Sequence, residues 1–160
     1  MKNELCVVDI KNFWIYNFAN NQEQAEETLC RAIEANKKDI ETWECHCKNY
    51  PDAEQFKTYL NQAQNKKYEI MTYNEYIQLE RNYYLNEPLK EINEETFNDM
   101  LNVLPPIKWC TKHNIEMFCM SEMLTGTYTS QYMYNLVTGK YYHKIVDITD
   151  QSTWGYNFIN

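Results

Sequence analysis

Cysteine and histidine side chains gather at two places in the sequence where they could bind a metal. Residues 45–47 read Cys-His-Cys, and Cys110 and His113 form a Cys-x-x-His pair that Cys119 follows. Zinc takes four such ligands, usually with two or more residues between the members of a pair so that the side chains converge. Only the second group has that spacing. A zinc site is therefore one hypothesis, and reduced cysteines buried in the core are the alternative.

A cysteine nucleophile would need a histidine base and a third group that orients the base. Cys110, His143 and Asp147 supply these residue types, but six cysteines and three histidines offer such combinations by chance. The nucleophile motif GxSxG is absent. A small zinc-binding or Cys-dependent enzyme is therefore kept as the alternative to a non-enzymatic protein. For the favoured, non-enzymatic interpretation we expect no cofactor.

Acidic residues cluster at the start of an expected helix that follows Asn93. Metal-dependent nucleases use clustered acids together with a lysine. Acids are also favourable at any helix N-terminus, because they interact with the helix dipole. We interpret the cluster as a solvated helix face, and carboxylates that imitate nucleic-acid phosphates are the alternative interpretation. Glu94, Glu95 and Asp99 are the acids that we expect to bind a partner.

Residues 125–134 (TGTYTSQYMY) alternate Thr or Ser with Tyr, as in a strand with two different faces. One interpretation directs the tyrosines toward helices of the core. The other exposes them as a binding surface, since Tyr and Met are enriched at protein interfaces. On the second interpretation, Tyr128, Tyr132 and Tyr134 contact a partner.

Charge restricts the class of partner. The chain of 160 residues has 15 Lys and Arg against 23 Asp and Glu, a formal net charge of −8. Such a surface repels nucleic-acid phosphates and attracts a basic protein surface, such as the phosphate channel of a nucleic-acid enzyme. We therefore expect a protein partner and no direct nucleic-acid binding. Only three glycines are present, and neither GxGxxG nor GxxxxGK[ST] occurs.

The sequence contains no apolar run near the roughly 20 residues that a membrane-spanning helix needs. The N-terminus has acidic residues within its apolar stretch and no small-residue cleavage site, so it does not match a signal peptide. We expect a protein of the host cytoplasm without membrane contact. Its six cysteines would then be mostly reduced.

The first part of the chain, residues 1–70, is expected to be mostly helical after a leading strand or hairpin. Residues 5–18 are rich in β-branched and aromatic side chains. Asn20 or Asn21 can cap a helix over residues 22–36, and Asp39 can cap a second, short helix. Pro51 suits the first turn of a third helix.

Residues 71–160 are expected to form an α+β domain. Thr72 and Glu75 form a T-x-x-E capping box, which predicts a helix over residues 73–85. A second helix is predicted from Glu94 to about residue 104, before Pro105-Pro106. Four strands follow between about residues 107 and 148 without intervening helices, so we predict an antiparallel four-stranded sheet that packs against these helices.

Residues 71–154 resemble uncharacterised proteins carried by phages and mobile elements of AT-rich, low-GC bacteria. The resemblance rests on the segments MTYNEYIQLERNYYLNEP, LPPIKW, IEMFCMSEM, TGTYTSQY and KYYHKIVD. It covers about half of the chain and implies no catalytic residue. Small acidic proteins from such elements are often inhibitors of host defence, for example anti-CRISPR proteins that bind Cas nucleases.

Together these observations favour a non-enzymatic inhibitor that docks on a host nucleic-acid enzyme, such as a Cas9-type CRISPR nuclease, through acidic and aromatic surface. Two alternatives remain. One is the zinc-binding or Cys-dependent enzyme described above. The other is a structural or regulatory mobile-element protein that forms a homodimer through its tyrosine face. The sequence is compatible with a monomer or a homodimer.

Overall fold

The structure is a computed structural model that describes residues 4–103 and 106–159, with the backbone alone at 106–110 and 119–123. It has the predicted α+β class with antiparallel sheets. The chain divides into two compact units, Met1–Glu80 and Arg81–Asn160. The sequence-based boundary at residue 70 stays a prediction. No helix in the described part of the chain combines the length and apolar character that crossing a membrane requires.

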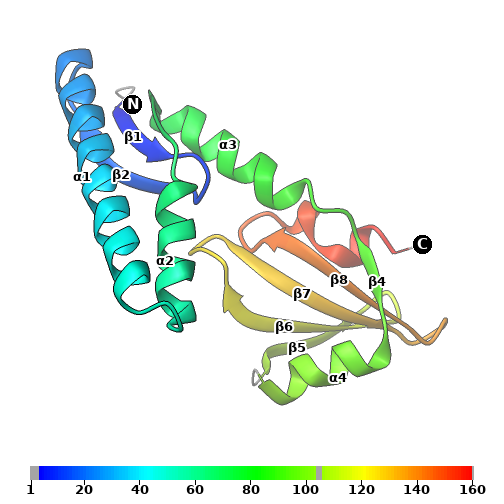
Figure 1. Cartoon of the computed structure of the whole chain (residues 1–160). Helices are drawn as coiled ribbons and strands as arrows, with labels where there is room; N and C mark the ends of the chain where they lie inside the picture. Colours follow the sequence, from blue (N-terminus) through cyan, green and yellow to red (C-terminus); the bar gives the residue numbers. More distant parts are fainter. Residues whose placement is uncertain (1–3, 104–105, 160) are drawn as a thin grey trace. The chain divides into compact units, whose positions relative to one another are not determined.

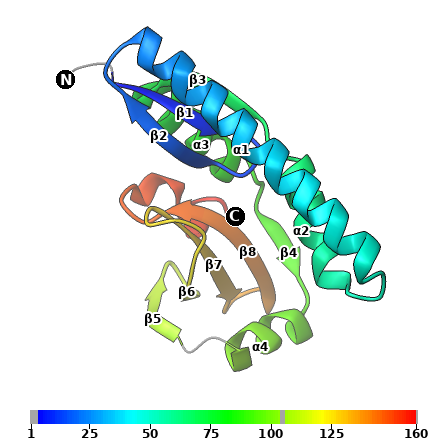
Figure 2. The same cartoon turned by 60° about the vertical axis from the view of Figure 1, so that its left-hand side comes forward.

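The first unit contains a three-stranded antiparallel sheet in the order β2-β1-β3 (Figures 1 and 2). Strands β1 (Leu5–Asp9) and β2 (Trp14–Ala19) form the predicted hairpin, with a bulge between Val7 and Val8. Strand β3 (Tyr68–Thr72) pairs with the other edge of β1 and was absent from the sequence-based expectation. Strand β2 therefore lies at an edge of the sheet.

A single helix, α1 (Gln22–Asn49), replaces the two helices predicted over this region. Asn21 caps it by accepting a hydrogen bond from the Gln24 backbone N–H. The predicted break near Asp39 is wrong, because no Gly or Pro interrupts the helix there. Helix α2 (Glu54–Gln64) lies along the second half of α1 (Figures 1 and 2).

Helix α3 (Tyr73–Leu85) has the predicted bounds and the predicted capping box. The Thr72 N–H donates to the Glu75 carboxylate over 2.7 Å, and the Glu75 N–H donates to the Thr72 hydroxyl over 3.2 Å. These hydrogen bonds lower the pKa of Glu75. In the first unit, Tyr76 packs with Cys6 and Val8 in a small core on one face of the sheet.

The second unit contains the predicted antiparallel meander and one further strand at its edge. Its strands are β4 (Lys90–Ile92), β5 (Pro106–Lys112), β6 (Ile115–Met123), β7 (Tyr128–Asn135) and β8 (Lys140–Asp147). Their spatial order is β4-β8-β7-β6-β5 (Figure 1), so β4 pairs with the last strand of the meander. The β5–β6 hairpin turns at His113 and Asn114, whose φ angles are 53° and 61°.

The two faces of this sheet have separate cores. Helix α4 (Glu94–Val103) covers one face, where Phe97 packs with Phe118 and Tyr132. Two short 3₁₀ turns near the C-terminus, η1 (Gln151–Thr153) and η2 (Gly155–Asn157), follow β8. Tyr156 of η2 contributes to the core on the opposite face. Alternation along β7 supplies both cores, since neighbouring side chains of a strand point to opposite faces.

Candidate functional site

The three acids predicted to bind a partner lie together on α4. Glu94, Glu95 and Asp99 are all exposed, and we refer to them as the acidic face of α4. Phe97 anchors the helix, since it is only 4% exposed and its ring lies 4.9 Å from that of Tyr141. The helix therefore presents its carboxylates to solvent from a fixed position in the second unit.

Glu94 also contacts Tyr141 of β8. Desolvation raises the pKa of Tyr141, and a hydrogen bond to the Glu94 carboxylate raises it further. The Tyr141 hydroxyl therefore stays protonated and can donate to Glu94. Lys140, the preceding residue of β8, forms an exposed ion pair with Glu91 at 2.9 Å. These contacts leave Glu95 and Asp99 as the acids of this face for which no contact within the chain is described.

The interpretation that exposes the strand tyrosines is wrong for Tyr128 and Tyr132. Tyr128 is 3% exposed and Tyr132 is 8% exposed, while Tyr134 is partly buried. Tyr128 stacks on Tyr84 of α3 at 4.8 Å, and Tyr132 belongs to the core beneath α4. The period-two alternation correctly indicates two faces, but both faces are covered. The tyrosines therefore stabilise the sheet, which is the other interpretation of the pattern.

The cysteines that were considered as metal ligands or core residues differ in how far they are buried. Cys45 is exposed on α1 and Cys47 is partly buried, and both are free thiols. Cys6 is buried as expected for a core cysteine, whereas Cys30 is exposed. The side chains of Cys110 and Cys119 lie outside the described residues. Among the side chains that the structure describes, no three His, Cys, Asp or Glu residues form a group that could hold a metal ion.

His143 and Asp147, two members of the conceivable catalytic triple, are engaged with different neighbours. The His143 ring lies 4.7 Å from the ring of Tyr132. Burial lowers the pKa of His143, and the positive charge of Lys90 lowers it further. Asp147 instead forms an ion pair with Arg81 at 2.9 Å. The two side chains therefore serve separate packing and charge-pairing roles.

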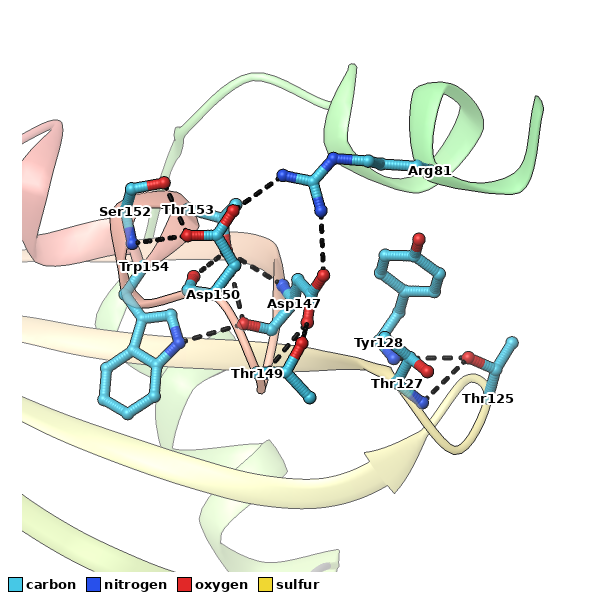
Figure 3. Close-up of polar contacts among 10 residues, drawn as sticks. All are labelled: Arg81, Thr125, Thr127, Tyr128, Asp147, Thr149, Asp150, Ser152, Thr153 and Trp154. Carbon is cyan, nitrogen blue, oxygen red and sulfur yellow. Dashed lines mark hydrogen bonds and ion pairs between the residues drawn. The ribbon is translucent and has the colours of Figure 1, made fainter. Parts of the chain in front are cut away.

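Arg81, Asp147 and Asp150 form a charged cluster in the second unit (Figure 3). One terminal nitrogen of Arg81 donates to Asp147 over 2.9 Å, and the other donates to Asp150 over 2.7 Å. This arrangement ties residue 81 of α3 to the end of β8 and to the turn after it. The pKa of Asp150 is lowered by hydrogen bonds from Ser152 and by Arg81.

Further hydrogen bonds fix the turn that carries these aspartates. Asp147 accepts from the backbone N–H and the hydroxyl of Thr149, and its own N–H donates to the Thr153 hydroxyl (Figure 3). The Trp154 indole N–H donates to the Asp147 carbonyl over 3.0 Å. Since these hydrogen bonds join parts of the same turn, the cluster is best explained as a structural clamp.

The comparison with known families concerns mainly the second unit. The profile of a family described as "Protein of unknown function (DUF1419)" matches residues 60–155. The chain belongs to the DUF1419 family. No curated protein and no solved structure matches it.

The DUF1419 match includes the acidic face of α4 and the Arg81 cluster. It covers the whole meander that the sequence predicts, and it begins within α2. Sequence reasoning located the acids of α4 from their position in a helix. It did not connect Arg81 with Asp147, because a pair so distant in sequence leaves no local pattern.

Proposed function

We propose that this DUF1419 protein is a non-enzymatic inhibitor that docks on a basic surface of a host nucleic-acid enzyme. The partner that we name for testing is a Cas9-type CRISPR nuclease. On this proposal a phage or mobile element encodes the inhibitor, and the two proteins bind in the cytoplasm of the host bacterium. The observation that carries this proposal is the exposure of three carboxylates on the anchored helix α4.

The placement of the acids supports docking for two physical reasons. Glu95 and Asp99 lie one helical turn apart, so their carboxylates can address neighbouring cations of a partner. The helix that carries them is held by Phe97 in the core, so little conformational freedom is lost when they bind. Because Tyr128 and Tyr132 of the sheet are buried, we assign the contact with the partner to the acids of this helix.

The net charge of −8 supports the same class of partner. Opposite charges accelerate the encounter of two proteins, and dissolved salt screens that attraction over about 10 Å at 0.1 M ionic strength. An inhibitor that acts in this way competes with nucleic acid for the same basic channel. Its potency must therefore fall as salt concentration rises.

The test measures the rate of DNA cleavage by a purified Cas9-type nuclease at increasing concentrations of this protein. The variant E94Q/E95Q/D99N removes three charges from the acidic face of α4. The matched control E23Q/E26Q/E27Q removes three exposed charges from the first turns of α1. We expect the first variant to lose about tenfold or more in inhibitory potency, because charged contacts across an interface each contribute about 1 kcal/mol or more.

The control variant has the same net charge as the test variant but keeps the acidic face of α4, so it should inhibit like the unmodified protein. The proposal would be wrong if the unmodified protein left the cleavage rate unchanged at low salt. An equal loss of potency in both variants would also overturn it, since net charge alone would then explain the inhibition.

A further inference from the structure

The first unit contains a cavity of about 500 Å³ between α1, α2 and one face of the three-stranded sheet. Six of the residues that line it carry the argument: Asp9, Trp14, Tyr16, Asn36, Asp39 and Tyr68. Strands β1, β2 and β3 supply four of these side chains, and α1 supplies the other two. The residues come together only through the tertiary fold, so no local sequence pattern predicts the cavity.

One wall of the cavity is aromatic. Trp14 is 69% exposed and Tyr16 is 41% exposed, although both are large side chains on the edge strand β2. The rings of Tyr16 and Tyr68 meet edge to face at 5.9 Å. The exposed faces of such rings are regions of negative potential that attract cations.

The opposite wall offers a hydrogen-bond acceptor that the described residues do not use. The Asn36 side-chain N–H₂ donates to the Ala63 carbonyl over 3.0 Å, which fixes the orientation of the amide. Its oxygen, Oδ1, is buried and has no hydrogen-bond partner in the described structure. Because this oxygen is buried, a ligand in the cavity reaches it only if neighbouring side chains move.

Charged groups give the cavity a negative balance. Asp9 is 2% exposed and accepts backbone hydrogen bonds from Lys11 and Lys67. Asp39 adds a second carboxylate, and the Lys66 ammonium lies 3.8 Å from it. The lining of the cavity therefore contains two carboxylates and one ammonium group. Burial raises the pKa of the Tyr68 hydroxyl, and the charge of Asp9 raises it further, as expected at a site of negative potential.

We propose that this cavity binds an organic cation, namely an ammonium or guanidinium group. The cation donates to Asp39, and the rings of Trp14 and Tyr16 lie against its positive charge. A phosphate or carboxylate ligand is disfavoured because two carboxylates and one ammonium group line the cavity. The proposal is independent of the function proposed above, because all of its residues lie in the first unit and none in α4.

Titration of the full chain by isothermal calorimetry tests the proposal. The cationic probes are N-acetyl-lysine amide, N-acetyl-arginine amide and cadaverine. N-acetyl-norleucine amide is the neutral control, because it has the lysine chain without the ammonium group. We expect saturable binding of a cationic probe and at least about tenfold weaker binding of the neutral control.

Two variants localise the binding. Asp39→Asn removes one carboxylate from an exposed position on α1, and we expect it to weaken binding about tenfold. Asp52→Asn removes the same charge from an exposed turn outside the cavity and should leave the affinity unchanged. Trp14→Leu should weaken binding of the cation several-fold and provides a second variant at an exposed site.

Tighter binding of the capped amino acids than of cadaverine would support a side chain of a partner protein as the natural ligand. Tighter binding of cadaverine would support a free diamine. The proposal is overturned if no cationic probe binds, or if the neutral control binds as tightly as the cations. Equal affinities of Asp39→Asn and Asp52→Asn would also overturn it.

Discussion

Arg81 and Asp147 form an ion pair in which the aspartate side chain is only 6% exposed, while the arginine side chain keeps 33% of its exposure. The nitrogen–oxygen distance is 2.9 Å. Asp147 has lost most of its hydration, so the guanidinium and the neighbouring hydrogen-bond donors must compensate its charge. The pair therefore links the stability of the β8 terminus to a residue of α3.

Replacing Arg81 by methionine should destabilise the protein by about 2–4 kcal/mol, because the Asp147 carboxylate would stay buried without its cation. Unfolding in urea measures this change through the free energy of unfolding. Lys90→Met is the matched control, since it removes a cation from the exposed ion pair with Glu87. That variant should lose less than about 1 kcal/mol. Equal losses in the two variants would contradict the role of Arg81 in compensating the buried carboxylate of Asp147.

Glu80→Gln should stabilise the protein near neutral pH. Glu80 is 9% exposed, and burial raises its pKa above the ordinary value of 4.5. The folded state therefore binds the proton more tightly than the unfolded state. The stability gained from protonated Glu80 is fully present below pH 4.5 and is lost as pH rises through the folded pKa. Glutamine resembles the protonated form, so its advantage over glutamate should vanish in acid.

Glu75→Gln, in the same helix, should change the stability of the protein in the opposite direction. The capping hydrogen bonds from Thr72 lower the pKa of Glu75, so its contribution is present above the ordinary value of 4.5 and is lost as pH falls through the folded pKa. This variant should be less stable than the unmodified protein at neutral pH and equally stable in acid. Urea unfolding of both variants across a pH series would refute the assignment if they changed in the same direction.

Gly155→Ala should destabilise the second unit by about 1–3 kcal/mol, because a Cβ there would overlap the end of the Met133 side chain in the core. The Gly155 N–H also donates to Gln131 over 2.9 Å, which limits how far the backbone can move away. Gly126→Ala is the control, since its Cβ would meet no atom within 4 Å. Urea unfolding curves that coincide for the two variants would contradict this packing.

The α3 helix was predictable from the sequence because its start is specified locally. Thr72 and Glu75 provide reciprocal capping bonds. The meander in the second unit was predictable for a similar reason, since its β-rich segments are separated by short turns. In α1, by contrast, the lysines before Asp39 resemble a helix end, but the residues on both sides favour helix and the chain continues through them.

Strands β3 and β4 have weaker local signals. Strand β4 has only three residues, and β3 follows a polar stretch and depends on pairing with β1. The candidate sites show the same division. The exposure of Glu95 and Asp99 could be predicted from their positions in a helix. The cavity beside Asn36 could not, because strands and helices from distant parts of the sequence form it. The direction of the tyrosines could not be predicted, because alternation does not reveal which faces are covered.

The strand order of the two sheets has a consequence for how the chain folds. Strands β5, β6 and β7 each pair with the next strand in sequence, so each of these hairpins closes a short loop. Strand β1 also pairs with β3, and Leu5 meets Thr72 only after α1 and α2 have been synthesised and brought together. Contacts between distant residues form slowly, because the chain loses entropy before the new contacts compensate. When the full chain refolds, we therefore expect the meander to form early and β1 to keep an open edge until β3 pairs with it.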